Sequence, residues 1–277
     1  MTAPADSGRM PDAKFLVPAT GPCPEFANGY VMFNPDGEAR RVLLYIGEQA
    51  KSLDGPLVFS WHSTLPTPED AVAWLGQSVI DMIKAEGGLV AAPTTADPSA
   101  RRPWDNTQLG PQNSDADQRL MDEIVACAQQ KIGIDLRRIH AVGMSAGGLK
   151  TAQVSLRRSG YLASVVVYSG GLIEGEMPPD QDPTNLFAAM ILYGGALDIS
   201  PVDATIYTDN SRRYLDLLES TGRFGFLCNH GGGHSVPNDS QASAWRFMKD
   251  HPFGTTPEPY AQTLPTNFLR YCALDTP

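Results

Sequence analysis

The chain has 277 residues, of which 42% are hydrophobic and 19% are charged, and these values are typical of a globular protein with a sizeable core. Its formal net charge of -10 at pH 7 disfavours a nucleic-acid partner, because binding to phosphates needs a basic surface. No apolar run reaches the ~18 residues of a membrane span. We therefore expect neither a nucleic-acid partner nor a membrane span.

The predicted elements begin, after an N-terminal extension of residues 1–29, with two strands at 30–33 and 41–46. The turn Asn-Pro-Asp-Gly joins them, so we expect an antiparallel hairpin at a sheet edge. Strands and helices then alternate: strand 57–61, helix 71–84, strand 88–92, helix 115–130, strand 138–142, helix 146–157, strand 163–168, strand 187–193, helix 205–220, strand 223–228 and helix 241–250. This α/β alternation predicts a single domain, a mostly parallel sheet with helices on both faces. Residues 252–277 are expected to form a C-terminal wrap.

The segment Gly143-Met144-Ser145-Ala146-Gly147 lies between a predicted strand and a predicted helix, which is the context of a nucleophile elbow. Such a turn holds its serine in a strained backbone conformation, and small neighbours let adjacent segments approach. The N–H groups at the helix N-terminus then face the developing oxyanion, with Ala146 as one expected donor. The pattern predicts Ser145 as a nucleophile, and a glycine-rich turn without chemistry is the alternative.

A nucleophilic serine in this setting needs an acid and then a histidine later in the chain. Asp198 follows the predicted strand 187–193, at a strand end where catalytic groups gather in α/β sheets. Asp203 is the rival acid, although an N-cap role at the next helix would also explain it. We expect Asp198 to be the acid.

Two histidines, His230 and His234, follow the last long predicted strand. The glycines between them give His234 a flexible route to the serine, so we expect His234 to be the base. His230 abuts the strand end and is expected only to line the substrate site. The letters His-Gly-Gly-Gly from His230 also match an esterase oxyanion loop, but that loop precedes the nucleophile, so we regard this match as accidental.

The oxyanion loop itself is expected at Trp61-His62-Ser63-Thr64, directly after the predicted strand 57–61. A backbone N–H of Thr64 or Ser63 would be the second oxyanion donor, and Ser63 would also contact the substrate. His62 is expected to orient this loop. Trp104, in the loop 101–113, is expected either as an aromatic wall for the substrate or as a buried anchor of its loop.

Other side chains are expected to serve structure. Packing or surface roles are expected for His140 and His251.

Four widely spaced cysteines form no CxxC pair, which argues against a zinc site, and no metal or cofactor is expected. One or two disulfides are expected, and Cys23 with Cys272 is the candidate pair because chain termini often approach each other. The alternative is that Cys23, Cys127, Cys228 and Cys272 are buried free thiols of a cytosolic protein.

Several motifs resemble the polyhydroxybutyrate depolymerase and feruloyl-esterase group of α/β-hydrolases: Gly133-Ile134-Asp135, the elbow from Gly143 to Gly148, Ser169-Gly170-Gly171, the loop from His230 to His234, and the stretch from Trp245 to Phe253. The resemblance spans residues 56–253. It implies the α/β-hydrolase fold and a triad in which Ser145 is the nucleophile, Asp198 the acid and His234 the base. Ser63 stands where the group usually has a glycine, which leaves the second oxyanion donor open.

The same resemblance implies hydrolysis of a carboxylic ester or polyester through an acyl-enzyme, by a chain that we expect to be a monomer. It does not select among polyester, feruloyl and simple acyl esters, which share one triad. A serine peptidase of the same fold and a catalytically silent polymer- or carbohydrate-binding domain are the alternatives. Residues 1–6 lack the charged-then-apolar pattern of an export signal, which fits either a cytoplasmic protein or a mature form of an exported one. Members of the group are nevertheless commonly secreted, which implies a secreted or periplasmic protein.

Overall fold

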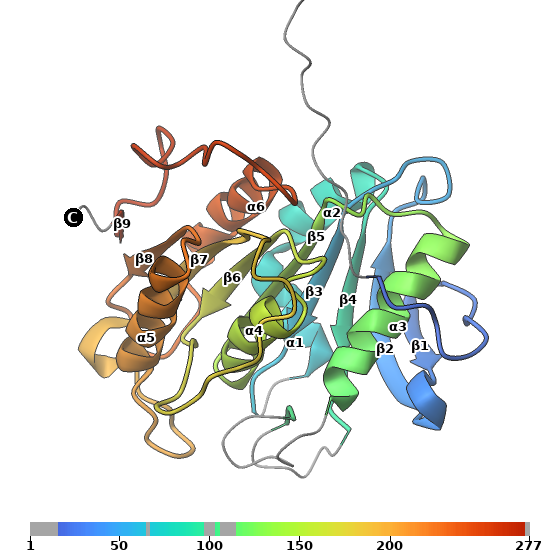
Figure 1. Ribbon diagram of the computed structural model, residues 1–277, viewed down its shortest axis with the longest axis horizontal. Coiled ribbons are helices and arrows are strands. Elements are labelled where there is room, and N and C mark those ends of the chain that lie inside the picture. The colour runs from blue at the N-terminus through green and yellow to red at the C-terminus, as the bar shows by residue number, and fades with distance from the viewer. Residues whose placement is uncertain (1–15, 65–66, 97–102, 106–114, 275–277) are drawn as a thin grey trace, which may run out of the picture.

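The computed structural model describes residues 16–64, 67–96, 103–105 and 115–274, and these residues form one nine-stranded sheet (Figure 1). Its strands lie in the order β1-β2-β4-β3-β5-β6-β7-β8-β9. Their bounds are β1 Gly29–Phe33, β2 Arg40–Ile46, β3 Leu57–Trp61, β4 Leu89–Pro93, β5 Ile139–Met144, β6 Ser164–Tyr168, β7 Ala188–Tyr193, β8 Gly225–Asn229 and β9 Cys272–Ala273. Strands β3 to β8 pair in parallel, whereas β1, β2 and β9 pair antiparallel. The predicted mostly parallel sheet and its edge hairpin are thus confirmed.

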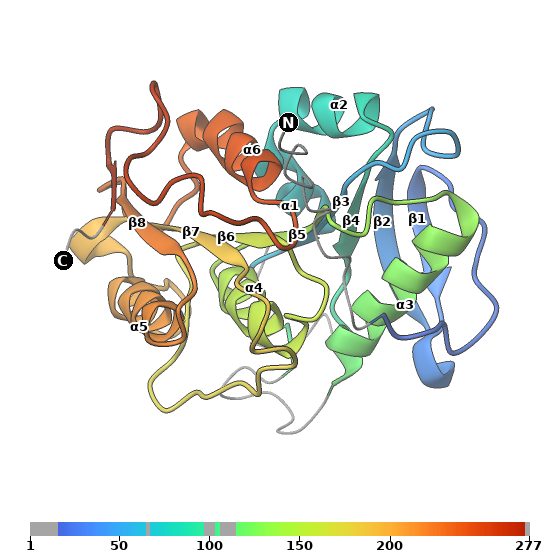
Figure 2. The ribbon, with the colours of Figure 1, turned by 45° about the horizontal axis from the view of Figure 1, so that its top comes forward.

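Helices cover both faces of the sheet (Figures 1 and 2). Their bounds are α1 Pro68–Leu75, α2 Gln77–Ala85, α3 Ala116–Lys131, α4 Ala146–Arg157, α5 Tyr207–Ser220 and α6 Gln241–Asp250, with short 3-10 turns η1 Pro35–Gly37, η2 Gly195–Leu197 and η3 Asn238–Ser240. Helices α3, α4 and α5 pack on one face and α1, α2 and α6 on the other, each set over its own apolar core. Every residue of the central strand β6 is buried, as its continuous apolar run predicts. Within the described ranges, no helix is long and apolar enough to cross a membrane.

Two elements differ from the prediction. The helix expected over 71–84 is two helices, because Gly76 between them has a φ of 81°, which interrupts helical hydrogen bonding and which glycine adopts without strain. The first of the two begins with a capping box in which Thr67 and Asp70 bond each other's backbone N–H. The C-terminal wrap also contributes to the sheet, since Cys272 and Ala273 pair antiparallel with β8. Two residues are too short a strand for any sequence pattern to reveal.

The cysteines form two disulfides, Cys23–Cys127 and Cys228–Cys272, so the predicted pairing of Cys23 with Cys272 is wrong. Cys23 is bonded to Cys127 on α3, a helix near the β1 end of the sheet, whereas Cys272 belongs to β9 at the opposite edge (Figure 1). The two cysteines near the ends of the chain are therefore held at opposite sides of the molecule. The alternative of four free thiols is also wrong.

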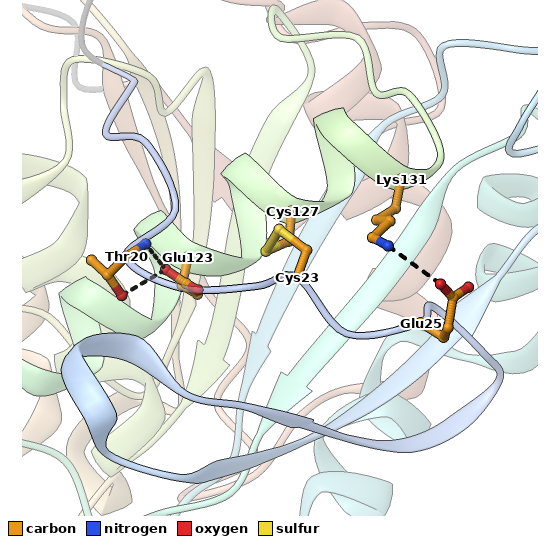
Figure 3. The surroundings of a disulfide bond; sticks show 6 residues. All are labelled: Thr20, Cys23, Glu25, Glu123, Cys127 and Lys131. Atoms are coloured by element: carbon orange, nitrogen blue, oxygen red, sulfur yellow. Dashed lines mark hydrogen bonds and ion pairs between the residues drawn. A yellow bond between two sulfur atoms is a disulfide. The ribbon is translucent and has the colours of Figure 1, made fainter.

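The bridge from Cys23 fastens the N-terminal segment along α3 (Figure 3). On one side of it, the N–H and hydroxyl of Thr20 donate to Glu123 at 2.7 and 3.1 Å. On the other side, Lys131 and Glu25 form an ion pair at 3.3 Å. A disulfide flanked by polar contacts holds this segment against the helix without any secondary structure of its own.

Candidate active site

Ser145 occupies a tight turn between β5 and α4, with a φ of 59° and a ψ of -119°. A residue with a side chain pays a strain cost for this positive φ, and such strain is concentrated at functional sites. Gly143 and Gly147 make the turn possible: a Cβ at Gly147 would collide with the carbonyl oxygen of Trp61, and one at Gly143 with the backbone of Gly147. The expected elbow geometry is therefore present, and it places the Ser145 side chain at the N-terminus of α4.

Asp198, His234 and Ser145 form one hydrogen-bonded line. His234 Nε2 lies 3.0 Å from Ser145 Oγ, and His234 Nδ1 lies 2.8 Å from Asp198 Oδ1. Asp198 is fully buried, and its other oxygen accepts the N–H of Gly194 at 2.9 Å. The three side chains follow the carboxyl ends of β5, β7 and β8, which meet at one edge of the parallel sheet. The tertiary structure thus brings together the three residues that the chain order singled out.

The loop that carries His234 is fastened to the end of the neighbouring strand. The N–H groups of His230 and Gly233 donate to the carbonyl oxygens of Tyr193 and Gly194, each at 3.0 Å. Gly233 has a φ of 68°, which lets the chain turn back toward Ser145. The glycines between the two histidines therefore shape a defined turn.

Asp203, the rival acid, has no hydrogen bond to either histidine of this loop among the described contacts. Its carboxylate instead accepts the N–H and hydroxyl of Thr205 at 3.2 and 2.8 Å in an exposed turn. The N-cap position of α5 is occupied by Ile206, so the N-cap role expected for Asp203 is wrong. The choice of Asp198 over Asp203 agrees with this geometry.

A cavity of about 450 Å³ opens beside the Ser145 side chain. It is lined by Ser63, Thr64, Trp74, Met144, Ser145, Pro201, Val202, His234, Ser235 and Val236. Ser63 and Thr64, which the oxyanion-loop prediction singled out, are part of this lining. Ala146 is the first residue of α4, so its N–H belongs to the open helix N-terminus next to Ser145. Met144, beside Ser145 in the elbow, is the one apolar lining residue from a motif that the sequence singled out. The other apolar lining residues were not predicted, because they come from helix α1 and from loops that carry no motif.

Trp104 is not a wall of this cavity, and that part of the prediction is wrong. Its ring is buried, packs edge-on against Trp61 with centroids 4.9 Å apart, and lies 4.6 Å from the ring of His62. Its indole N–H donates to the carbonyl oxygen of His62 at 2.8 Å. Trp104 therefore anchors its loop, the alternative that the sequence left open, while most of the loop 101–113 lies outside the described residues.

His230 does not line the cavity either, which corrects its predicted contact with substrate. Its Nδ1 accepts the N–H of Gly232 at 3.2 Å, its ring lies edge-on to Tyr271, and burial lowers its pKa.

His62 fits the expected role in orienting its loop, since its Nδ1 contacts the Ser63 carbonyl oxygen at 2.7 Å and burial lowers its pKa.

The two remaining histidines are buried and lie away from the cavity. His140 contacts Ser164 Oγ at 2.9 Å, and burial lowers the pKa of His140 to about 3. His251 contacts the Phe247 carbonyl oxygen and Glu258 at 2.7 and 2.8 Å. Of the two roles expected for them, packing is therefore the one observed.

A buried cluster of charged side chains contacts α4, the helix that presents Ser145. Asp117 contacts Arg40 at 2.7 Å and Lys150 at 3.2 Å, and Lys150 also pairs with Asp105. Burial alone would raise the pKa of Asp117, but the two cations hold it well below its usual value. Lys150 lies on α4, the helix that begins at Ser145, and Asp105 directly follows Trp104. The cluster thus fixes the Trp104 segment to the helix that presents Ser145.

Tyr207 is a further site residue that the sequence did not predict. It is the first residue of α5, its hydroxyl oxygen lies 3.0 Å from Ser145 Oγ, and only 3% of it is exposed. Its ring stacks on that of His234, with centroids 4.8 Å apart and planes 14° apart. Only a helix start after Asp198 was visible in the sequence, and no motif marks a tyrosine there.

In the part of the chain that the structure describes, no three histidine, cysteine, aspartate or glutamate side chains are grouped so as to hold a metal ion.

No protein-family model and no curated protein matches the sequence. Solved structures nevertheless share the architecture. The native structure of the protein pOPH has a TM-score of 0.71 at 18% identity, over 94% of this chain and 96% of its own. That of sOPH has a TM-score of 0.73 at 17% identity, over 93% of this chain and 96% of its own. A ferulic acid esterase has a TM-score of 0.58 at 15% identity, over 79% of this chain and 96% of its own. With its strand order and these structural neighbours, the chain has the α/β-hydrolase fold.

Proposed function

We propose that this chain is a serine esterase that hydrolyses carboxylic esters through an acyl-enzyme. The observation that carries the proposal is the hydrogen-bonded line from Asp198 through His234 to Ser145. A carboxylate facing Nδ1 favours the imidazole tautomer with its proton on that nitrogen, so the Nε2 lone pair faces the serine hydroxyl. The serine can then transfer its proton as it attacks.

Hydrolysis would proceed in two steps. In the first, Ser145 Oγ attacks the ester carbonyl, His234 takes the serine proton and then gives it to the departing alcohol, and Asp198 stabilises the imidazolium. In the second, His234 takes a proton from water as the water attacks the acyl carbon, and it returns that proton to Ser145 Oγ as the acyl–oxygen bond breaks and the carboxylic acid leaves. The N–H groups of Ala146 and Thr64 would hold the oxyanion in both steps, because Ala146 begins α4 and Thr64 lines the cavity.

The cavity supports an apolar acyl group. Trp74, Met144, Val202 and Val236 are among its lining residues. The segment that includes Val202 also exposes Leu197, Ile199 and Ile206 to solvent, a concentration of apolar side chains that suits an extended hydrophobic substrate. A polyester of the polyhydroxyalkanoate type is therefore the first substrate class that we propose. The likeness to a ferulic acid esterase makes feruloyl and acetyl esters the second.

The two disulfides support an oxidising compartment for the mature protein. Disulfides persist in secreted and periplasmic proteins and are rare where thiols are kept reduced. We therefore propose a secreted or periplasmic location.

The decisive experiment compares wild type with Ser145→Ala on p-nitrophenyl esters and with a fluorophosphonate label. Because the three residues act as a unit, the substitution should lower kcat by several orders of magnitude and abolish labelling. Ser155→Ala, on the same helix, is the control and should leave kcat unchanged. Full activity of Ser145→Ala would contradict the proposal.

Three further measurements address the substrate class and the competing functions. Mass spectrometry of the products from polyhydroxyalkanoates, an aromatic polyester and feruloyl sugars would identify the acyl class. Faster turnover of peptides than of esters would instead identify a peptidase. A wild-type protein that binds polymer but is not labelled at Ser145 would be a silent binding domain.

A further inference from the structure

Tyr207 contacts all three members of the proposed triad. Its backbone N–H donates to the Asp198 carbonyl oxygen at 3.0 Å, its ring stacks on His234, and its hydroxyl lies 3.0 Å from Ser145 Oγ. The residue is nearly fully buried and is not part of the cavity lining. The Tyr207 hydroxyl therefore acts on the serine, and the geometry gives it no direct contact with a substrate in the cavity.

The direction of the bond between the two hydroxyls follows from counting protons. Asp198 faces Nδ1 of His234, so Nε2 is the acceptor for the single proton of the Ser145 hydroxyl. Because this proton is donated to His234, the Ser145 hydroxyl has no second hydrogen to donate to Tyr207. The bond between Tyr207 and Ser145 must consequently run from the phenol to Oγ, with the tyrosine as the donor.

We propose that Tyr207 is a further catalytic residue, whose O–H stabilises the negative charge that develops on Ser145 Oγ. This inference rests on the proposed esterase function. During attack the serine proton moves to His234 Nε2, a bond forms between Oγ and the carbonyl carbon, and the carbonyl π pair moves onto its oxygen. Tyr207 keeps its own proton throughout, and its hydrogen bond strengthens as Oγ becomes more negative.

The ring of Tyr207 has a second part in this arrangement. Because the phenol ring lies nearly parallel to the imidazole, it limits rotation of His234 out of the plane that joins Asp198 and Ser145. Both groups of Tyr207 thus act on the same proton transfer, the hydroxyl on the oxygen that loses the proton and the ring on the base that receives it.

The same helix provides a matched control. Tyr214, also on α5 and fully buried, places its hydroxyl 2.6 Å from Ser155 Oγ on α4. It links the same two helices through the same pair of chemical groups, but the serine that it contacts is not the proposed nucleophile. A purely structural role of Tyr207 would make Tyr207→Phe and Tyr214→Phe alike in activity.

The experiment measures kcat and KM on p-nitrophenyl butyrate, the rate constant of fluorophosphonate labelling, and Tm. Tyr207→Phe should lower kcat and the labelling rate by about tenfold, the equivalent of one hydrogen bond, and leave KM within about twofold. Tyr207→Leu should lower kcat further, because the stacked ring is also lost. Tyr214→Phe should leave kcat and the labelling rate unchanged, even if its Tm is lower than that of wild type.

The results that overturn the inference are distinct from those that overturn the esterase function. A wild-type protein that neither hydrolyses the ester nor takes the label would refute the esterase function itself. An active wild type with a Tyr207→Phe variant of equal kcat would refute only the role of the hydroxyl. If Tyr207→Phe does not fold, 3-fluorotyrosine at position 207 retains ring and hydroxyl but is a stronger donor. It should alter the labelling rate, and an unchanged rate would count against the inference.

Discussion

The indole N–H of Trp104 donates to the carbonyl oxygen of His62 at 2.8 Å, so the segment after β4 holds the segment after β3 in place. The two rings also pack against each other. His62 is followed by Ser63 and Thr64, which line the cavity beside Ser145. A buried tryptophan that does not line the cavity thus supports the backbone that is proposed to hold the oxyanion.

Trp104→Phe should lower the free energy of unfolding by about 1 kcal/mol, because it retains an aromatic ring but leaves the His62 carbonyl oxygen without this donor. Loss of this hydrogen bond should also shift the Thr64 backbone, and because its N–H is a proposed oxyanion donor, kcat should fall several-fold. Urea denaturation and kinetics on p-nitrophenyl esters of increasing acyl length test both effects. If Trp104 instead contacted substrate, the variant would alter the preference for acyl length, and that result would contradict the anchoring role.

Asp198→Asn should lower kcat by about 10⁴-fold, since the amide no longer holds the His234 tautomer that accepts the serine proton. Asp203→Asn is the matched control: an asparagine oxygen can still accept the bonds from Thr205, so kcat should change by less than about twofold. Steady-state kinetics on one ester suffices. Comparable losses of kcat in the two variants would contradict the role of Asp198 as the acid.

Replacing both cysteines of either disulfide by serine should lower the free energy of unfolding by about 2–4 kcal/mol. Cys23 and Cys127 are 104 residues apart and Cys228 and Cys272 are 44 apart, so removal of the first bridge should cost more by up to about 1 kcal/mol. None of the four cysteines lines the cavity, and kcat at 25 °C should therefore be retained. Denaturation curves of the two double variants, with kinetics on the same samples, check this. A variant with normal stability but no activity would be inconsistent with a structural role.

His140 should make the protein less stable in acid. Burial, with smaller contributions from neighbouring Arg138 and His251, lowers its pKa to about 3 from an ordinary value of 6.5. Between these two values the unfolded chain binds a proton that the folded chain does not. The contribution of His140 to stability is therefore complete above about pH 6.5, and it falls by about 1.4 kcal/mol per pH unit as the pH drops toward 3.

His140→Gln tests this dependence, because the glutamine amide has no proton to gain in this range and can still bond Ser164. The loss of unfolding free energy between pH 7 and pH 4.5 should be smaller in the variant than in wild type by about 2.5 kcal/mol. Equal losses in the two proteins, measured by urea denaturation at both pH values, would show that His140 does not titrate as its burial requires.

Local patterns were sufficient for most of the fold. Alternating strands and helices are visible because apolar periodicity and turn residues are properties of neighbouring positions, and helix α4 and strand β3 have the bounds that these patterns predict. The break at Gly76 and the short strand β9 were not predicted, since the first depends on a backbone angle and the second on a partner strand distant in sequence.

Neighbouring residues and the order of the chain were enough to predict the alternation of strands and helices, the elbow at Ser145, and the succession of Asp198 and His234. The folded chain was needed to reveal the disulfide pairing, the burial of Trp104, the exclusion of His230 from the cavity, and the placement of Tyr207 against Ser145. These depend on contacts between segments tens of residues apart, and no local pattern encodes which distant segment a side chain will meet.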